Sequence, residues 1–331
     1  MKKIIFTLLL TGSLIVTGQE KDDKGTFTLS GTVDVYGTTN FTSGPGTPGI
    51  LIANPGNANA FGLGFANTVF AYEKGKSGVV ADLAFGPRAD DANLAGAINQ
   101  LYVYYNINDK LTLTAGQFNT FLGYEVISPA ANFHYTVSYL FNAGPFSHTG
   151  VKLNYAASED LSFMLAVTNA HALTSADGNF ADATQLGAQI GYKGQYLNFI
   201  SGAVSDTSAK DWIFLDYTGG FDLSDTFYFG VNAAYANSSD EDSGYSGVAL
   251  YLQNKFTENF SLGFRPEFFT SKSAGMKSNV SAFTLTSNVS VTENLKFITD
   301  LRLDSSKDGL IEAFPMKDNT STLTLAAVYS F

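Results

Sequence analysis

The chain has 331 residues, a formal net charge of −11 and no cysteine. So acidic a chain has no electrostatic footprint for nucleic acid, and without cysteine no disulfide framework stabilises the fold. Because 45% of the residues are hydrophobic and 14% are aromatic, the chain is not a disordered acidic protein either.

The N-terminus has the three parts of a secretory signal peptide. Lys2 and Lys3 form a basic start, a short apolar stretch runs to Val16, and small residues follow at Thr17 and Gly18. The stretch is shorter than the ~20 apolar residues of a spanning helix, and Gly12 and Ser13 interrupt it. An N-terminal anchor helix is the alternative interpretation.

Three segments follow from this start. We expect a signal peptide over residues 1–18, cleaved between Gly18 and Gln19, and a short N-terminal segment over residues 19–25. The rest of the chain, residues 26–331, is then one exported domain.

The distribution of hydrophobicity favours a membrane β-barrel. Mean hydropathy is +0.04, high for a water-soluble protein, yet no segment after the signal peptide resembles a transmembrane helix. A closed barrel needs only every second residue apolar on its lipid face, which keeps the average near neutral. The 28 Phe and 17 Tyr suit aromatic girdles at the two membrane interfaces.

Period-two alternation is clearest in the segments 27–36, 260–268 and 295–304, where apolar residues occupy one face and polar residues the other. A soluble sandwich could alternate in the same way. Repetition of such segments along the chain, without a helical stretch between them, favours the membrane barrel.

Turn signals predict the topology. Five sites share small polar, acidic and polar residues before a large apolar one: 108–111, 158–161, 224–227, 257–260 and 292–295. Two further short connections use Gly75 and Gly194 for positive φ. Longer Gly/Ser/Asp-rich loops are expected near 43–60, 87–97, 119–145, 170–183, 205–209, 237–244, 271–278 and 305–319. Seven short periplasmic turns and eight long outer loops join sixteen strands, so we predict an all-β, transmembrane, antiparallel up-and-down barrel of about 16 strands.

The C-terminal segment alternates up to the last residue. Leu323, Leu325, Tyr329 and Phe331 share one face. Tyr329 and the terminal Phe331 resemble the assembly signal of bacterial outer-membrane barrels, although a soluble edge strand could end this way by chance.

Motifs around the middle of the chain carry a family likeness. They are Gly116-Gln117-Phe118, Gly123-Tyr124-Glu125, Pro129, Asn132-Phe133, Pro145 and His148-Thr149-Gly150-Val151, with Asp34-Val35-Tyr36 nearer the start. The sequence resembles the OmpL-like β-barrel outer-membrane porin family of Bacteroidota type. The resemblance implies a porin-like protein in the cell outer membrane of a Gram-negative bacterium, assembled by the barrel assembly machinery.

The longest connection, Asn119 to Pro145, is the candidate constriction. By analogy with general porins, in which the same connection narrows the pore, we expect it to fold inward. Its ionisable residues are Glu125 and His134. The alternative is an external loop that closes over the barrel mouth.

Strand alternation places a set of charges on the lumen side. A charge on the lipid face near the midplane would cost ~2–4 kcal/mol, so the inward orientation is favoured. The residues are Lys152, Arg265, Lys296, Arg302, Asp34, Asp82, Glu267 and Asp300. Whether they form a selectivity field or a structural salt-bridge network stays open at this point.

No catalytic or cofactor site is evident. Ser147 and His148 fall on opposite strand faces, and His171 has no matching serine. The acidic loop 238–243 could hold divalent cations, but like Asp90-Asp91 it is more simply a solvated loop. We therefore expect no enzyme, no cofactor and no metal site.

Two functions remain in competition. The first is a porin that forms a passive or weakly selective channel for small hydrophilic solutes. The second is a loop-plugged structural or surface-binding barrel without significant conductance. The expected partners are outer-membrane lipid, lipopolysaccharide, the assembly machinery and further copies of the chain in a homo-oligomer, and not nucleic acid. A barrel-based outer-membrane enzyme is a weaker alternative.

Overall fold

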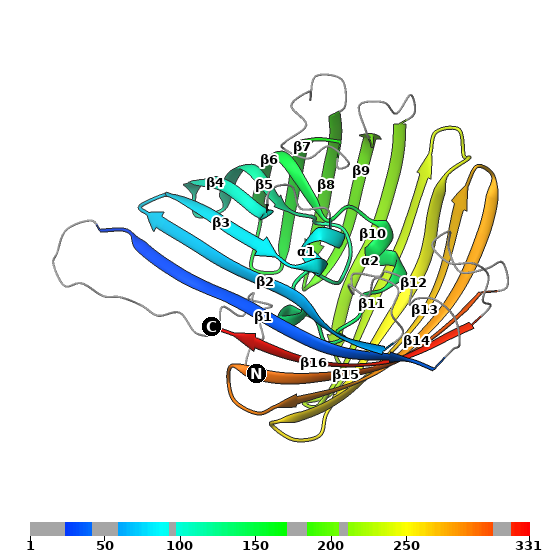
Figure 1. Cartoon of the computed structure of the whole chain (residues 1–331). Coiled ribbons are helices and arrows are strands. Elements are labelled where there is room, and N and C mark those ends of the chain that lie inside the picture. The colour runs from blue at the N-terminus through cyan, green and yellow to red at the C-terminus, as the bar shows by residue number, and fades with distance from the viewer. Residues whose placement is uncertain (1–23, 42–58, 93–96, 171–183, 205–210, 307–318) are drawn as a thin grey trace.

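The computed structural model describes residues 24–41, 59–92, 97–170, 184–204, 211–306 and 319–331. Sixteen strands in this part of the chain close into an antiparallel barrel, in which each strand pairs with its sequence neighbours and β1 pairs with β16 (Figure 1). The strands are β1 (Thr26–Asn40), β2 (Asn59–Lys74), β3 (Ser77–Phe85), β4 (Ile98–Asn108), β5 (Leu111–Asn119), β6 (Ser147–Ala156), β7 (Leu161–Asn169), β8 (Thr184–Tyr192), β9 (Gln195–Ala203), β10 (Asp211–Asp222), β11 (Phe227–Ser238), β12 (Gly244–Lys255), β13 (Phe260–Ser273), β14 (Met276–Ser290), β15 (Leu295–Ser306) and β16 (Asn319–Ser330). The predicted fold class is confirmed.

Burial alternates along each strand in the sense opposite to that of a water-soluble protein. In β1, the side chains of Val33 and Val35 are 47% and 45% exposed, whereas Asp34 and Tyr36 between and beyond them are buried. Exposed apolar side chains therefore cover the outside, and polar and charged side chains face inward. Successive strand residues point to opposite faces, so this inversion presents an apolar surface to lipid.

The seven short turns lie where the sequence predicts them. The small polar residue that opens the turn signature explains why it forms a turn. The hydroxyl of Ser158 accepts hydrogen bonds from the backbone amides of Asp160 and Leu161, at 3.3 and 3.1 Å. Ser224 and Thr292 do the same for the residues that follow them. The side-chain oxygen satisfies backbone donors that a two-stranded turn leaves free.

One expected outer loop is wrong. Residues 271–278 form a tight hairpin instead of a longer loop, because β13 and β14 stay paired up to Ser273 and Met276. Only Ala274 and Gly275 connect them, both at positive φ (47° and 76°). The polar, small residues that suggested a loop are the exposed ends of two long strands. The expected loops 43–60, 170–183, 205–209 and 305–319 lie largely outside the described residues.

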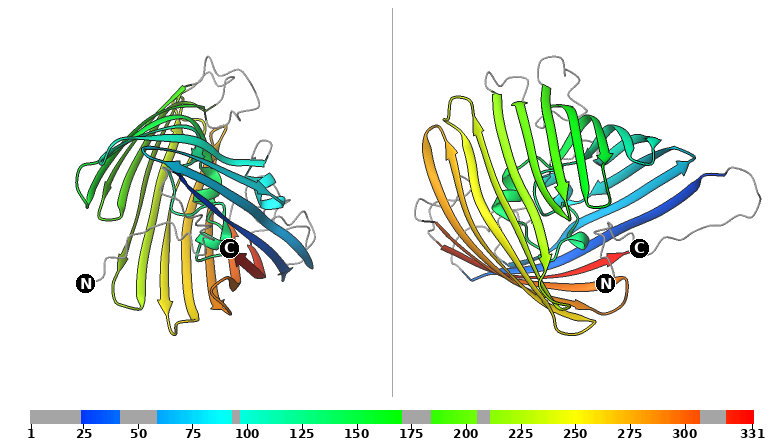
Figure 2. Two further views of the ribbon diagram at one scale, coloured as in Figure 1. Left: turned by 90° about the vertical axis from the view of Figure 1, so that its left-hand side faces the viewer. Right: turned by 180° about the vertical axis from the view of Figure 1, so that it is seen from behind.

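Two outer connections carry short helical turns inside the barrel. The connection from β5 to β6, residues 120–146, is called the inner loop from here on; it contains η2 (Pro129–Ala131) and α2 (Tyr139–Ala143). The connection from β3 to β4 carries α1 (Pro87–Asp91). In Figure 1, α1 and α2 lie within the outline of the barrel, and the two further views in Figure 2 show the strands closing around it.

The inner loop packs mainly against β12 to β16, and its first residues, Phe121 to Gly123, also contact β8, β9 and β10. Its α2 turn contacts β12 and β13, and η2 contacts β16. An apolar cluster joins loop residues Ile127 and Leu140 to Phe65 of β2, Tyr251 of β12 and Phe269 of β13. This core lies inside the barrel, so the inner loop is a packed element of the fold and not a free segment.

The described residues include no helix that is both long enough and apolar enough to cross a membrane.

Candidate pore constriction

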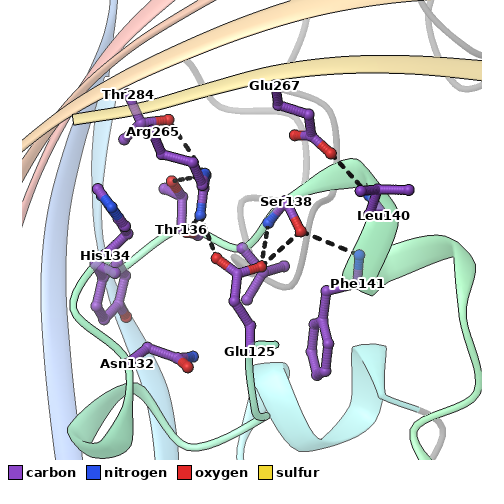
Figure 3. A network of polar contacts seen from close by, with 12 residues as sticks. Glu125, Asn132, His134, Thr136, Ser138, Leu140, Phe141, Arg265, Glu267 and Thr284 are labelled. Atoms are coloured by element: carbon purple, nitrogen blue, oxygen red, sulfur yellow. Dashed lines mark hydrogen bonds and ion pairs between the residues drawn. The ribbon is translucent and has the colours of Figure 1, made fainter. Parts of the chain in front are cut away.

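Glu125 and Arg265 form the central contact between the inner loop and the wall. Arg265 Nη1 lies 2.5 Å from Glu125 Oε1, and the two side chains are 0% and 3% exposed (Figure 3). Arg265 also donates to the carbonyl oxygen of Thr136 at 2.6 Å and to Thr284 Oγ1 at 3.2 Å. On the loop side, Glu125 Oε2 accepts from the amide and the hydroxyl of Ser138, both at 2.7 Å. The buried carboxylate of Glu125 therefore joins the inner loop to the wall at Arg265 and joins two parts of the loop to each other at Ser138.

Wall carboxylates hold amide groups of the inner loop. Glu267 on β13 accepts from the amides of Tyr139 and Leu140, at 3.0 and 2.9 Å, where α2 begins. The first amides of a helix have no partner within it, so a carboxylate at this end satisfies them. Asp300 on β15 accepts from the amide of Thr136 at 2.7 Å, and Asp216 on β10 accepts from that of Gly123 at 2.9 Å.

Cations and an amide side chain of the wall hold the loop carbonyls. Arg302 on β15 donates to Val137 at 2.7 Å, and Asn288 on β14 donates to Phe133 at 2.8 Å. Lys296 makes a longer contact with Ala130, at 3.4 Å. Arg302 is itself paired with Asp304, at 2.9 Å. Side chains of the wall thus accept hydrogen bonds from amides of the loop and donate to its carbonyl oxygens. These bonds allow the loop backbone to be buried without regular secondary structure.

The connection between β3 and β4, which contains α1, also binds the inner loop. Arg88 of α1 is fully buried and donates to the carbonyl oxygens of Ile127 and Tyr135, at 3.3 and 2.7 Å. Its guanidinium lies over the Tyr135 ring, 4.7 Å from the centroid. The Tyr135 hydroxyl in turn donates to Asp34 on β1 at 2.5 Å.

His134 of the inner loop is buried between the loop and β14. Its Nδ1 lies 2.6 Å from Thr286 Oγ1, and its Nε2 has no hydrogen-bond partner among the described residues. Burial, together with the nearby charges of Arg265 and Arg302, lowers the pKa of this imidazole well below its ordinary value. His134 is therefore neutral at physiological pH.

Further contacts hold the inner loop to itself and to the wall strands β11 and β12. Asn132 accepts from the amide of Val126 at 3.0 Å and donates to the carbonyl oxygen of the same residue at 2.6 Å. Tyr124 stacks on Tyr251, with ring centroids 4.0 Å apart, and its hydroxyl donates to Tyr228 at 2.8 Å.

The structure brings together most of the charges that the sequence placed in the lumen. Those at the inner loop are Asp34, Glu125, Arg265, Glu267, Lys296, Asp300 and Arg302. Around Glu125 they form a buried hydrogen-bonded network. The other two lie elsewhere on the wall: Asp82 accepts from the amides of Asn67, Asn99 and Gln100, and the Lys152 ammonium lies 4.2 Å from the Phe118 ring centroid.

Three residues of this network escaped the sequence analysis. Asp216 and Asp304 lie on the buried face of their strands, and the alternation that identifies Asp300 would have found them. Arg88 gives no such signal, because it sits in an outer connection beside Asp90 and Asp91.

The C-terminal residue closes the barrel seam. The amide and carbonyl of Phe331 exchange two hydrogen bonds with Gly31 on β1, both 3.0 Å long. A Cβ atom at Gly31 would lie 2.6 Å from the Phe331 ring, so only glycine leaves room for the ring there. Tyr329 is 47% exposed on the outer face.

The remaining histidine and acidic residues do not form a catalytic or metal site among the described residues. His148 lies against the inner loop with Nε2 3.0 Å from Thr120 Oγ1. Among the described residues, no group of three or more His, Asp or Glu side chains is arranged to hold a metal ion.

Solved outer-membrane channels share this fold. The outer membrane channel DcaP of Acinetobacter baumannii is 13% identical, with a TM-score of 0.60 over 96% of this chain and 100% of that one. An anion-selective porin from Comamonas acidovorans is 12% identical, with a TM-score of 0.64 over 93% and 100%. OmpT of Vibrio cholerae is 11% identical, with a TM-score of 0.57 over 94% and 99%, and a trimer form of OmpT is also similar. At such identities the likeness shows the fold alone.

A search among curated proteins finds no match. The model of one protein family, described as beta-barrel porin-2, OmpL-like, matches residues 26–331. The chain therefore belongs to the OmpL-like family of β-barrel porins and is an outer-membrane channel protein.

Proposed function

We propose that the protein is a passive or weakly selective channel for small hydrophilic solutes, and that the inner loop is its constriction. The observation that carries this proposal is the uneven packing of the loop, which buries the wall of β13 and β14 far more than that of β5 and β6. Arg265, Glu267 and Thr284 on the loop-covered wall are 0% exposed. Inward residues on the other side of the barrel, such as Thr112 and Asn154, stay partly exposed.

The partly exposed wall consists of β4 to β9. Its inward side chains are mostly uncharged hydroxyls, amides and tyrosines: Tyr102, Tyr104, Asn106, Thr112, Asn154, Ser162 and Gln189. Such groups exchange hydrogen bonds with water and with most hydrophilic solutes at similar cost, so they discriminate weakly. A passage along this wall would accept many small solutes.

We infer that export and assembly follow from the two ends of the sequence. Residues 1–18 would direct secretion and be removed before Gln19, leaving residues 19–25 as a short segment ahead of the barrel. Tyr329 and Phe331 would be read by the barrel assembly machinery. Lipid and lipopolysaccharide would contact the exposed apolar face. The trimer form of OmpT supports a homo-oligomer. We propose no enzymatic activity for the chain.

The rival function is a plugged barrel. The apolar core between the inner loop and the wall, together with the buried Arg88 of α1, favours it because both fill space inside the barrel. The outer loops of such a barrel would then bind partners at the cell surface.

Reconstitution in planar bilayers separates the two functions. The channel predicts stepwise single-channel currents from the purified wild-type protein. A variant in which residues 121–145 are replaced by a short Gly/Ser linker should conduct more. A silent wild type beside a conducting loop variant would establish the plugged barrel instead.

A further inference from the structure

Six adjacent strands of the barrel carry a single fully charged residue. From β4 to β9, Lys152 on β6 is the one Lys, Arg, Asp or Glu within the strands. Inward side chains of this arc, such as Thr112 and Asn154, stay partly exposed, although Phe121 of the inner loop reaches β8. The one charge that these six strands offer to a passing solute is therefore positive.

Lys152 has no charged neighbour on the wall. Its cross-strand partners are Thr114 on β5 and Ala166 on β7, and Tyr104 on β4 continues the same row. The side chain is partly exposed, and its ammonium contacts the face of Phe118. Lys152 forms no ion pair with any described residue, so no carboxylate in the described part of the chain compensates its charge.

Glu73, near the periplasmic end of β2, is exposed on the inward row of Tyr104 and accepts a hydrogen bond from the Tyr104 hydroxyl. Seven carboxylates deeper inside the barrel are arranged in the opposite way from Lys152. Each is at most 5% exposed and accepts at least two hydrogen bonds. They are Asp34, Asp82, Glu125, Asp216, Glu267, Asp300 and Asp304. Their donors are oriented toward the negative charge and offset its field, and none of them presents a free oxygen to a passing ion.

The other inward cation between the two rims that reaches water is also a lysine. Lys296 on β15 is partly exposed, and β15 lies seven strands from β6 one way around the ring and nine the other. The two lysines therefore lie on opposite sides of the barrel. Asp90 and Asp91 are exposed on α1, which packs against β2 and β3 and not against the strands of the arc.

We propose that the passage favours small anions, such as chloride and hydrophilic carboxylates or phosphates, and that Lys152 is the residue that determines this preference. The inference rests on the proposed channel function. An uncompensated charge beside a narrow aqueous path acts on every ion that passes, because the low-dielectric wall focuses its field. Paired charges in the same wall act far less, since each field is cancelled within a few ångströms.

The test is the reversal potential of the full-length protein in planar bilayers, with a gradient of KCl at low ionic strength. The wild type should prefer chloride over potassium. Lys152→Gln should lower the chloride-to-potassium permeability ratio by about threefold or more, the effect of removing one charge at a few ångströms in water, and Lys152→Glu should lower it further. Lys152→Arg keeps the charge and should keep the ratio.

Lys277→Gln is the matched control. Lys277 is exposed near the outer end of β14, and this variant removes the same charge without touching the lumen. Its ratio should equal that of the wild type. The unitary current of each variant shows that the barrel has folded and inserted.

The outcomes separate the inference from the function on which it rests. A conducting wild type that prefers potassium, or a Lys152→Glu channel with the wild-type reversal potential, overturns the anion preference and leaves the channel function standing. A wild-type protein that inserts but carries no current overturns the channel function, and the anion preference with it.

Discussion

Glu125 of the inner loop and Arg265 of β13, which lie 140 residues apart, meet in an ion pair that is closed off from water. Two charges that the sequence places in the lumen thus serve to fix the loop. This pair, with the hydrogen bonds of Ser138 and Thr136 around it, makes the loop a built part of the wall.

Breaking this pair from the arginine side should loosen the inner loop. Arg265→Gln leaves Glu125 buried without its cation, and removing one partner of a buried ion pair costs about 3–5 kcal/mol. We expect a lower urea midpoint for unfolding in lipid or detergent, and larger current fluctuations in bilayers. Arg302→Lys, which keeps a cation near Asp304, is the milder comparison. An Arg265→Gln protein with wild-type stability and quiet currents would contradict the account.

Removing the negative charge of Glu125 should change ion preference little. Glu125 is 5% exposed, and its carboxylate accepts hydrogen bonds from three donor groups. An ion in the passage therefore senses its charge weakly. Glu125→Gln should therefore shift the reversal potential less than Lys152→Gln does. If Glu125→Gln gave the larger shift, the buried network would not isolate its charges from the solutes.

Acidic pH should release the inner loop through His134. Because the pKa of this imidazole in the folded protein lies below that of a free histidine, protonation favours the state in which the loop has left the wall. The stabilisation is fully present above the free value of about 6.5 and is lost as pH falls below it. Protease cleavage within residues 120–146 should increase from pH 7 to pH 5.

The His134→Gln variant is the control for this pH effect. Glutamine can donate or accept at Thr286 and does not titrate, so the increase in cleavage should be smaller than in the wild type. An equal increase in both proteins would assign the effect to other groups.

Deletion of Phe331 should block accumulation in the outer membrane. Besides any role as an assembly signal, the residue exchanges two backbone hydrogen bonds with Gly31 across the seam. Phe331→Tyr keeps both the aromatic ring and the backbone and should assemble. The measurement is the amount of heat-modifiable, folded protein in outer-membrane fractions. Wild-type amounts of the truncated protein would contradict the prediction.

The strands and turns could be predicted from sequence because their signals are local. Two-residue alternation placed Asp34 and Arg302 inside, and side chains such as Ser158 close their turns with the next few residues. The pairing of Glu125 with Arg265 could not be predicted, since it depends on where a long loop lands on a distant strand. The inward fold of α1 depends on Arg88 finding loop carbonyls, and no sequence period encodes that contact.

In the proposed channel, water and solutes pass along the partly exposed inward residues of β4 to β9, away from the wall of β12 to β16 that the inner loop covers. The absence of cysteine from the chain makes a direct test available. Asn154 on the partly exposed wall and Thr284 on the covered wall are each replaced by cysteine, one at a time. A small, charged, membrane-impermeant thiol reagent is then added to open channels in a planar bilayer. The account predicts that Asn154→Cys channels lose current in steps while Thr284→Cys channels are unaffected. Modification of Thr284→Cys with Asn154→Cys unreactive would contradict it.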